Sequence, residues 1–291
     1  MGLATIGVVI ASICFGIVPV FARSLTDAGM APHAVAFYRY LLALVFLMPI
    51  VWRWRHEART LAWGGFVGVA MGLGWVGYVR AIEVVPISTA GVLYMTYPAF
   101  TLVISWLLFG DKPSRRAIFA AVLIVVAAAI VSQPAAIDPQ LIPAMLLSLA
   151  APIGFGLGIS VLVHRMTRIP ALARIGIVSG GSILGLLPLV VTTEVAELLP
   201  VDGTGWMLVA GIGLGTALVP QLIYTVCSPI VGTARTAMAG SIELPVMFAI
   251  GWFFFGEAIS LIHLAALGLV LTAIVMTPGR RARSIAATMQ E

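Results

Sequence analysis

Two stretches of this chain end in the same way: residues 97–111 read YPAFTLVISWLLFGD, and residues 244–257 read LPVMFAIGWFFFGE. Each has a proline near its start, a tryptophan four residues before a glycine, and an acidic residue directly after that glycine. Each belongs to an apolar run of roughly 20 residues or more, the length that a helix needs to cross a bilayer. The fold therefore depends on how many such runs the chain holds and on how these two are related.

Ten apolar runs fill most of the 291 residues, of which 61% are hydrophobic and 9% are charged, and the mean hydropathy is +1.12. Soluble chains carry roughly 25% charged residues. The strict alternation of a membrane barrel is absent, so we expect an all-α membrane protein. The predicted spans are 3–22, 33–52, 61–82, 86–109, 116–132, 141–163, 170–192, 206–228, 233–255 and 259–277.

The basic residues indicate how the chain is oriented. With the N-terminus inside, 13 of the 16 lysines and arginines fall in cytoplasmic connections, in the basic tail or beside them, and the exceptions are Arg23, Arg39 and Arg80. This asymmetry predicts that both termini are cytoplasmic, in a bacterial-type inner membrane. It also explains the net charge of +5 without a nucleic-acid partner. Cys14 and Cys227 lie within apolar runs and are expected to be small buried side chains.

The first span lacks a basic segment before it and is longer than the apolar core of a signal peptide, so we expect it to remain as a helix. The two similar stretches then occupy the fourth and the ninth spans. A unit of five spans is odd, so its second copy must cross the membrane in the opposite direction. We expect two inverted five-helix repeats, residues 1–137 and 138–291. Inverted repeats are typical of secondary transporters.

With this repeat, and with the aromatic pattern Phe37-Tyr38-Arg39-Tyr40 in the second span, the chain resembles the drug/metabolite transporter superfamily, EamA type. The aromatic amino acid exporter branch is the suggested comparison. The resemblance implies a basket-like fold with a central cavity lined mainly by spans 1, 3, 4, 6, 8 and 9, with spans 5 and 10 at the periphery. It also implies export of amino acids or other small metabolites, or transport of nucleosides or drugs.

Two charged residues inside spans are candidates for a substrate site. Glu243 lies about ten residues into the ninth span, hence roughly 15 Å deep. A carboxylate there costs at least about 2.5–3.5 kcal/mol unless it is protonated or paired, so it binds a substrate ammonium, carries a proton, or forms a fixed polar contact. The side chain of Arg39 either snorkels to the membrane surface or forms a structural ion pair. Alternatively, it faces the cavity, where its guanidinium suits a substrate carboxylate.

Polar and aromatic side chains at helical spacing are expected to line the cavity, because their polar tips avoid lipid. An aromatic stripe that only packs is the alternative. These candidates are Trp75, Tyr78, Tyr94, Tyr97, Gln221 and Tyr224. The glycines of the third and eighth spans favour close packing, rocking, or both. The candidate hinges are Pro98, Pro245, Gly72 and Gly215.

The sequence predicts no enzyme, cofactor or metal site. It has no nucleotide-binding motif, and its histidines lack metal-ligand spacing. An intramembrane enzyme would need paired acids or a nucleophile with a base. We therefore expect a secondary transporter that exports amino acids or similar metabolites by alternating access, with a small molecule and the bilayer as its partners and a monomer as a plausible state. A multidrug or nucleoside exporter and a channel are the alternatives.

Overall fold

The computed structural model describes residues 2–132, 139–231, 240 and 242–276. Within these ranges the regular structure is helical throughout, as the sequence predicts. The helices of the first half are α1 (Leu3–Gly16), α2 (Val18–Asp27), α3 (Pro32–Arg53), α4 (Ala58–Ile82), α5 (Ile87–Tyr94), α6 (Tyr97–Phe109) and α7 (Arg115–Ser132). Those of the second half are α8 (Ile142–Ser148), α9 (Ala150–His164), α10 (Ala171–Val191), α11 (Val195–Leu198), α12 (Gly203–Ala210), α13 (Val219–Val231), α15 (Glu243–Phe255) and α16 (Leu261–Met276).

Seven helical segments of the described chain are long and apolar enough to cross a membrane. They are Leu3–Asp27, Pro32–Arg53, Ala58–Ile82, Ile87–Phe109, Pro139–His164, Ala171–Val191 and Gly203–Tyr224, and they match seven of the predicted spans. α7, α15 and α16 are shorter, and the first part of the predicted span 233–255 lies outside the described residues. The chain is therefore a multi-pass helical membrane protein, and ten spans remain a prediction.

Four of the predicted spans are interrupted rather than continuous. α1 meets α2 at Ile17, α5 and α6 are separated by Met95 and Thr96, and α8 meets α9 at Leu149. Pro98 explains the second break, because its ring excludes the carbonyl of the residue four positions earlier from an α-helical bond. That residue is Tyr94, where α5 ends. The eighth predicted span contains a π-helical stretch, Gly211–Leu218, between α12 and α13.

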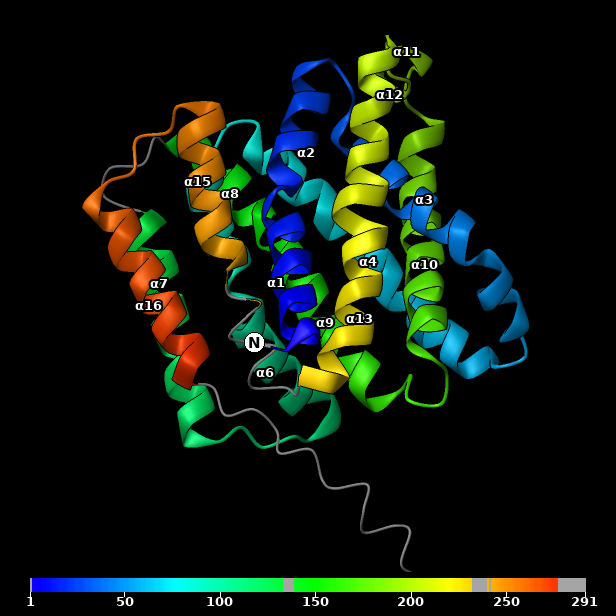
Figure 1. The fold of residues 1–291 in the computed structure, drawn as a ribbon, viewed down its shortest axis with the longest axis horizontal. Helices are drawn as coiled ribbons and strands as arrows, with labels where there is room; N and C mark the ends of the chain where they lie inside the picture. The colour runs from blue at the N-terminus through cyan, green and yellow to red at the C-terminus, as the bar shows by residue number, and fades with distance from the viewer. Residues whose placement is uncertain (1, 133–138, 232–239, 241, 277–291) are drawn as a thin grey trace, which may run out of the picture.

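α4 packs against helices of both halves of the chain. It contacts α3, α8, α9 and α10, whereas α7 and α16 pack against each other at one edge of the bundle (Figure 1). The glycines of α4 make these contacts close. A side-chain carbon built on Gly68 would lie 2.2 Å from the carbonyl oxygen of Val178 on α10, and one on Gly74 would lie 2.5 Å from that of Ala150 on α9. Close packing, one of the two roles expected for the glycines of the third span, is thus confirmed.

Large apolar side chains on the outside of the bundle fit a lipid environment. Trp106, Leu107, Trp252 and Phe253 are each more than half exposed. In water such surface would be costly, because each square ångström of exposed apolar area costs about 25 cal/mol. In a bilayer the hydrocarbon chains cover it.

The two stretches with matching sequence end in matching turns. Gly110 ends α6 with φ 73° and Gly256 ends α15 with φ 64°, a left-handed conformation in which glycine avoids the steric cost of a side chain. The next residue folds back in both cases. The Asp111 N–H donates to the carbonyl of Ser105 (3.3 Å), and the Glu257 N–H donates to that of Gly251 (2.9 Å).

Candidate functional site

A connected row of aromatic rings runs from α4 through the break between α5 and α6 to α9. Trp75 and Tyr78 of α4 have ring centroids 5.4 Å apart, and Tyr78 is 5.7 Å from Tyr94. Tyr94 lies 5.9 Å from Tyr97, and Phe155 of α9 lies 4.9 Å from Tyr97. The four aromatic residues that the sequence singled out in α4, α5 and α6 are therefore brought together. The Tyr78 hydroxyl is buried and has no hydrogen-bond partner among the described residues.

Arg39 lies against one end of this row. Its guanidinium carbon is 4.0 Å from the centroid of the Trp75 ring, and its Nη1 donates to the hydroxyl of Thr216 at 3.2 Å. A cation over an indole face gains about 2 kcal/mol when water is excluded. The head group of Arg39 thus lies between α3, α4 and the π-helical stretch, rather than reaching out to the end of its helix. The structure therefore disfavours the snorkelling interpretation.

Thr216 is held for this contact by its own helix, because its hydroxyl also donates to the carbonyl of Ile212 at 2.8 Å. It can therefore accept the Arg39 bond while remaining fixed in position. A guanidinium has five N–H donors. Within the described part of the chain, the bond to Thr216 is the one hydrogen bond that Arg39 makes, so the guanidinium keeps donors for a further acceptor.

Glu243 is the first residue of α15 and lies near Arg39 and the aromatic row. Its charge acts on Arg39 and on Tyr78, Tyr94 and Tyr97. Among the described residues, its carboxylate has no hydrogen bond, and no cation lies within 4 Å of it. The N-terminus of a helix carries a partial positive charge that favours a carboxylate. A carboxylate and a guanidinium therefore share one region, inside the bundle, without contacting each other.

The two candidates on α13 belong to a helix that packs against α1. Tyr224 makes an edge contact with Phe15 of α1, with ring centroids 6.1 Å apart, and lies near Tyr97. Gln221 lies three residues earlier on the same helix and is partly buried.

The candidate hinges have different surroundings. Pro98 stands in the first turn of α6, directly after the break, and Pro245 stands in the first turn of α15. Gly72 packs tightly, because a side-chain carbon there would lie 2.9 Å from the carbonyl oxygen of Ser182. Gly215 lies within the π-helical stretch, and a side-chain carbon there would meet nothing within 4 Å.

Sequence reasoning did not select Thr216 or Phe155 for this site. Thr216 looks like an ordinary helical residue until the π-helical stretch directs it toward Arg39. Phe155 did carry a signal, because Phe155-Gly156 repeats Phe15-Gly16 of the first half. Both phenylalanines contact tyrosines of the site, Phe155 contacting Tyr97 and Phe15 contacting Tyr224.

Comparisons with known proteins agree with a transporter. Residues 2–133 match the EamA-like transporter family. Two proteins named "Uncharacterized transporter", from Helicobacter pylori strains J99 and 26695, are each 26% identical over 132 residues, which is 44% of this chain and 44% of the relative. The chain thus matches less than half the length of these relatives. No branch that exports aromatic amino acids is indicated.

One solved crystal structure shares the fold over almost the whole chain. It superposes with a TM-score of 0.63 at 16% identity and covers 96% of this chain and 98% of that chain. The family match is to transporters rather than to enzymes, as the sequence predicted. The chain is accordingly a multi-pass helical membrane protein whose residues 2–133 are similar to the EamA-like transporter family.

Proposed function

We propose that the chain is a secondary transporter that exports amino acids or similar small metabolites across an inner membrane by alternating access. In this proposal the ten predicted spans form two inverted repeats, residues 1–137 and 138–291, and both termini are cytoplasmic. The matching turns at Gly110 and Gly256 support the repeat, as does the Lys/Arg asymmetry.

One observation carries the substrate class: Arg39 and Glu243 bring opposite charges to one site without satisfying each other. Burying a charge in a membrane is costly, so an incompletely paired guanidinium and carboxylate favour a ligand that supplies the missing partners. A zwitterion does so, because its carboxylate accepts from Arg39 while its ammonium donates to Glu243. The aromatic row beside them suits an apolar side chain.

The helix interruptions at this site also support a substrate-binding role for it. Transporters often bind substrates where helices are interrupted near the membrane midplane, because free backbone groups and helix ends are available there. The break between α5 and α6 lies between Tyr94 and Tyr97, and Glu243 begins α15. Candidate binding groups thus lie at a helix break, which Tyr94 and Tyr97 flank, and at a helix start, where Glu243 stands.

Counterflow in proteoliposomes tests this proposal. The vesicles receive labelled amino acids with aromatic, branched or hydroxyl side chains, together with analogues that lack either the amine or the carboxylate. We expect saturable exchange of at least one zwitterion and little exchange of its truncated analogues. Exchange of nucleosides or drugs instead would favour the alternative exporter, and an ohmic current would favour a channel. Either result would overturn the proposed function.

Variants test whether the carboxylate of Glu243 takes part in zwitterion exchange. Glu243→Gln removes a charge-assisted hydrogen bond, worth roughly 1.5–3 kcal/mol, and is expected to weaken zwitterion exchange by about 10- to 150-fold. The matched control is Glu83→Gln, which breaks the exposed Arg80–Glu83 pair of 3.2 Å and is expected to leave exchange unchanged. Wild-type exchange by a folded Glu243→Gln protein would remove this carboxylate from the mechanism.

A further inference from the structure

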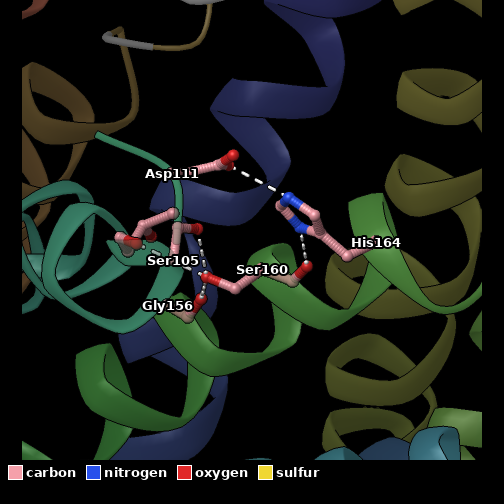
Figure 2. Close-up of polar contacts among 6 residues, drawn as sticks. Ser105, Asp111, Gly156, Ser160 and His164 are labelled. Carbon is pink, nitrogen blue, oxygen red and sulfur yellow. Dashed lines mark hydrogen bonds and ion pairs between the residues drawn. The ribbon is translucent and has the colours of Figure 1, made fainter. Parts of the chain in front are cut away.

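The turn that follows α6 is bound to the end of α9 by one histidine. The imidazole of His164 stacks on the ring of Phe109, with centroids 4.3 Å apart and planes 1° apart. Its Nε2 lies 3.0 Å from a carboxylate oxygen of Asp111 (Figure 2). Its Nδ1 lies 2.8 Å from the carbonyl oxygen of Ser160. Phe109, Gly110 and Asp111 thus present one ring face and one carboxylate to His164.

The two ring nitrogens of His164 each lie beside an oxygen atom, one of the Asp111 carboxylate and the other the carbonyl of Ser160. His164 thus links the Phe109 ring and the Asp111 carboxylate to the end of α9.

The turn that follows α15 carries the same arrangement at the opposite end of the bundle. The guanidinium of Arg23, on α2, lies 4.7 Å from the centroid of the Phe255 ring. Its Nη1 lies 3.9 Å from a carboxylate oxygen of Glu257. Glu257 also accepts hydrogen bonds from the backbone N–H groups of Ile87 and Ser88 and from the Ser88 hydroxyl, at the start of α5.

The two contacts correspond part by part. In each, a basic residue near the end of the first span of one half lies over the phenylalanine before the capping glycine of the other half and beside the acid after it. α2 ends at the same end of the bundle as α11, whereas the turn between α6 and α7 lies at the other end (Figure 1). Both contacts join residues 1–137 to residues 138–291, one at each end.

We propose that these contacts are a pair of equivalent latches, the Arg23–Phe255–Glu257 latch and the His164–Phe109–Asp111 latch, and that opening each one exposes the site to one side of the membrane. This rests on the proposed alternating access. If the halves move relative to each other, contacts that cross between them at the two ends must break in turn. The structure, in which both are closed, corresponds to an occluded arrangement.

The test measures access of water to the site from each side, which needs no substrate. In a Cys14→Ser, Cys227→Ser background, Phe155→Cys supplies a reporter thiol in the aromatic row. Oriented vesicles are treated with a membrane-impermeant maleimide from one side at a time. His164→Gln is expected to raise the labelling rate roughly two- to fivefold from the α6–α9 end alone, as expected for loss of one partly exposed polar contact. Arg23→Gln is expected to do so from the α2–α15 end alone.

A rescue variant separates a latch from a merely structural contact. His164→Arg places a guanidinium over Phe109, as Arg23 does over Phe255, so this variant is expected to keep the wild-type labelling rate. Unfolding temperatures in detergent identify variants that fail to fold. The latches are overturned if folded His164→Gln and Arg23→Gln proteins label like wild type, or if both change access from the same side. Side-specific labelling without amino acid counterflow would retain the latches and reject the proposed substrate.

Discussion

Replacing Gly68 by alanine tests how tightly α4 and α10 are packed. The added carbon would lie 2.2 Å from the Val178 carbonyl oxygen and 2.7 Å from both the Gly181 Cα and the Ser182 backbone nitrogen. Ordinary contacts begin at 3.4 Å, so the two backbones must separate by about 1.2 Å (3.4 Å minus 2.2 Å) along this direction. These neighbours are backbone atoms and cannot rotate away. Overpacking of this kind costs roughly 1–3 kcal/mol.

Gly65→Ala, one turn earlier on α4, is the matched control, because a side-chain carbon there would meet nothing within 4 Å. Alanine favours a helix by up to about 1 kcal/mol over glycine, so the control should gain stability where Gly68→Ala loses it. Because this gain is common to both variants, their stabilities should differ by the overpacking cost of roughly 1–3 kcal/mol, which at roughly 2–4 °C per kcal/mol is a difference of about 2–12 °C in unfolding temperature in detergent. Equal unfolding temperatures would refute the close approach of these helices.

Three further predictions concern single contacts. Gly256→Ala forces a side chain into a left-handed turn and should cost about 1–2 kcal/mol of stability, measured as a lower unfolding temperature in detergent. Ser182→Ala removes the 2.8 Å bond from its hydroxyl to the Gly68 carbonyl and should cost about 1 kcal/mol in the same assay. Arg39→Lys keeps the charge but loses the planar group over Trp75, so zwitterion counterflow should fall roughly tenfold while unfolding changes little; unchanged counterflow would contradict the role given to the guanidinium.

Much of the architecture follows from hydropathy, because each bilayer-spanning helix must satisfy its backbone internally and bury or expose apolar side chains. The seven long spans could be predicted from hydropathy. The matching turns at Gly110 and Gly256 could be predicted from the repeated sequence. The interruptions were not all readable. Pro98 marks the break after Tyr94, but no residue type signals the π-helical stretch at Gly211–Leu218.

The site was predicted in part for the same reason. Polar and aromatic residues within spans are costly to expose to lipid, which is why Arg39, Glu243 and Tyr94 were conspicuous. Their partners were not, since Thr216 and Phe155 are unremarkable in sequence and become neighbours through the fold. Likewise, the repeated Phe-Gly-acid turn was visible in the sequence, whereas the basic residue that each turn contacts depends on which helix end lies beside the turn.

The π-helical stretch sets the rotational register of the helix that follows it. An α-helix turns by about 100° per residue, so removing one residue from a wide π turn re-aims everything beyond it by that angle. Deleting Gly215, where no neighbour is touched, would shorten the stretch while α12 stayed in place. Tyr224 would then swing away from Phe15, and α13 would present a different face to α1. Because of this irregular stretch, α12 and α13 can each turn toward their own neighbouring helices the face that packs against them, although both belong to one span.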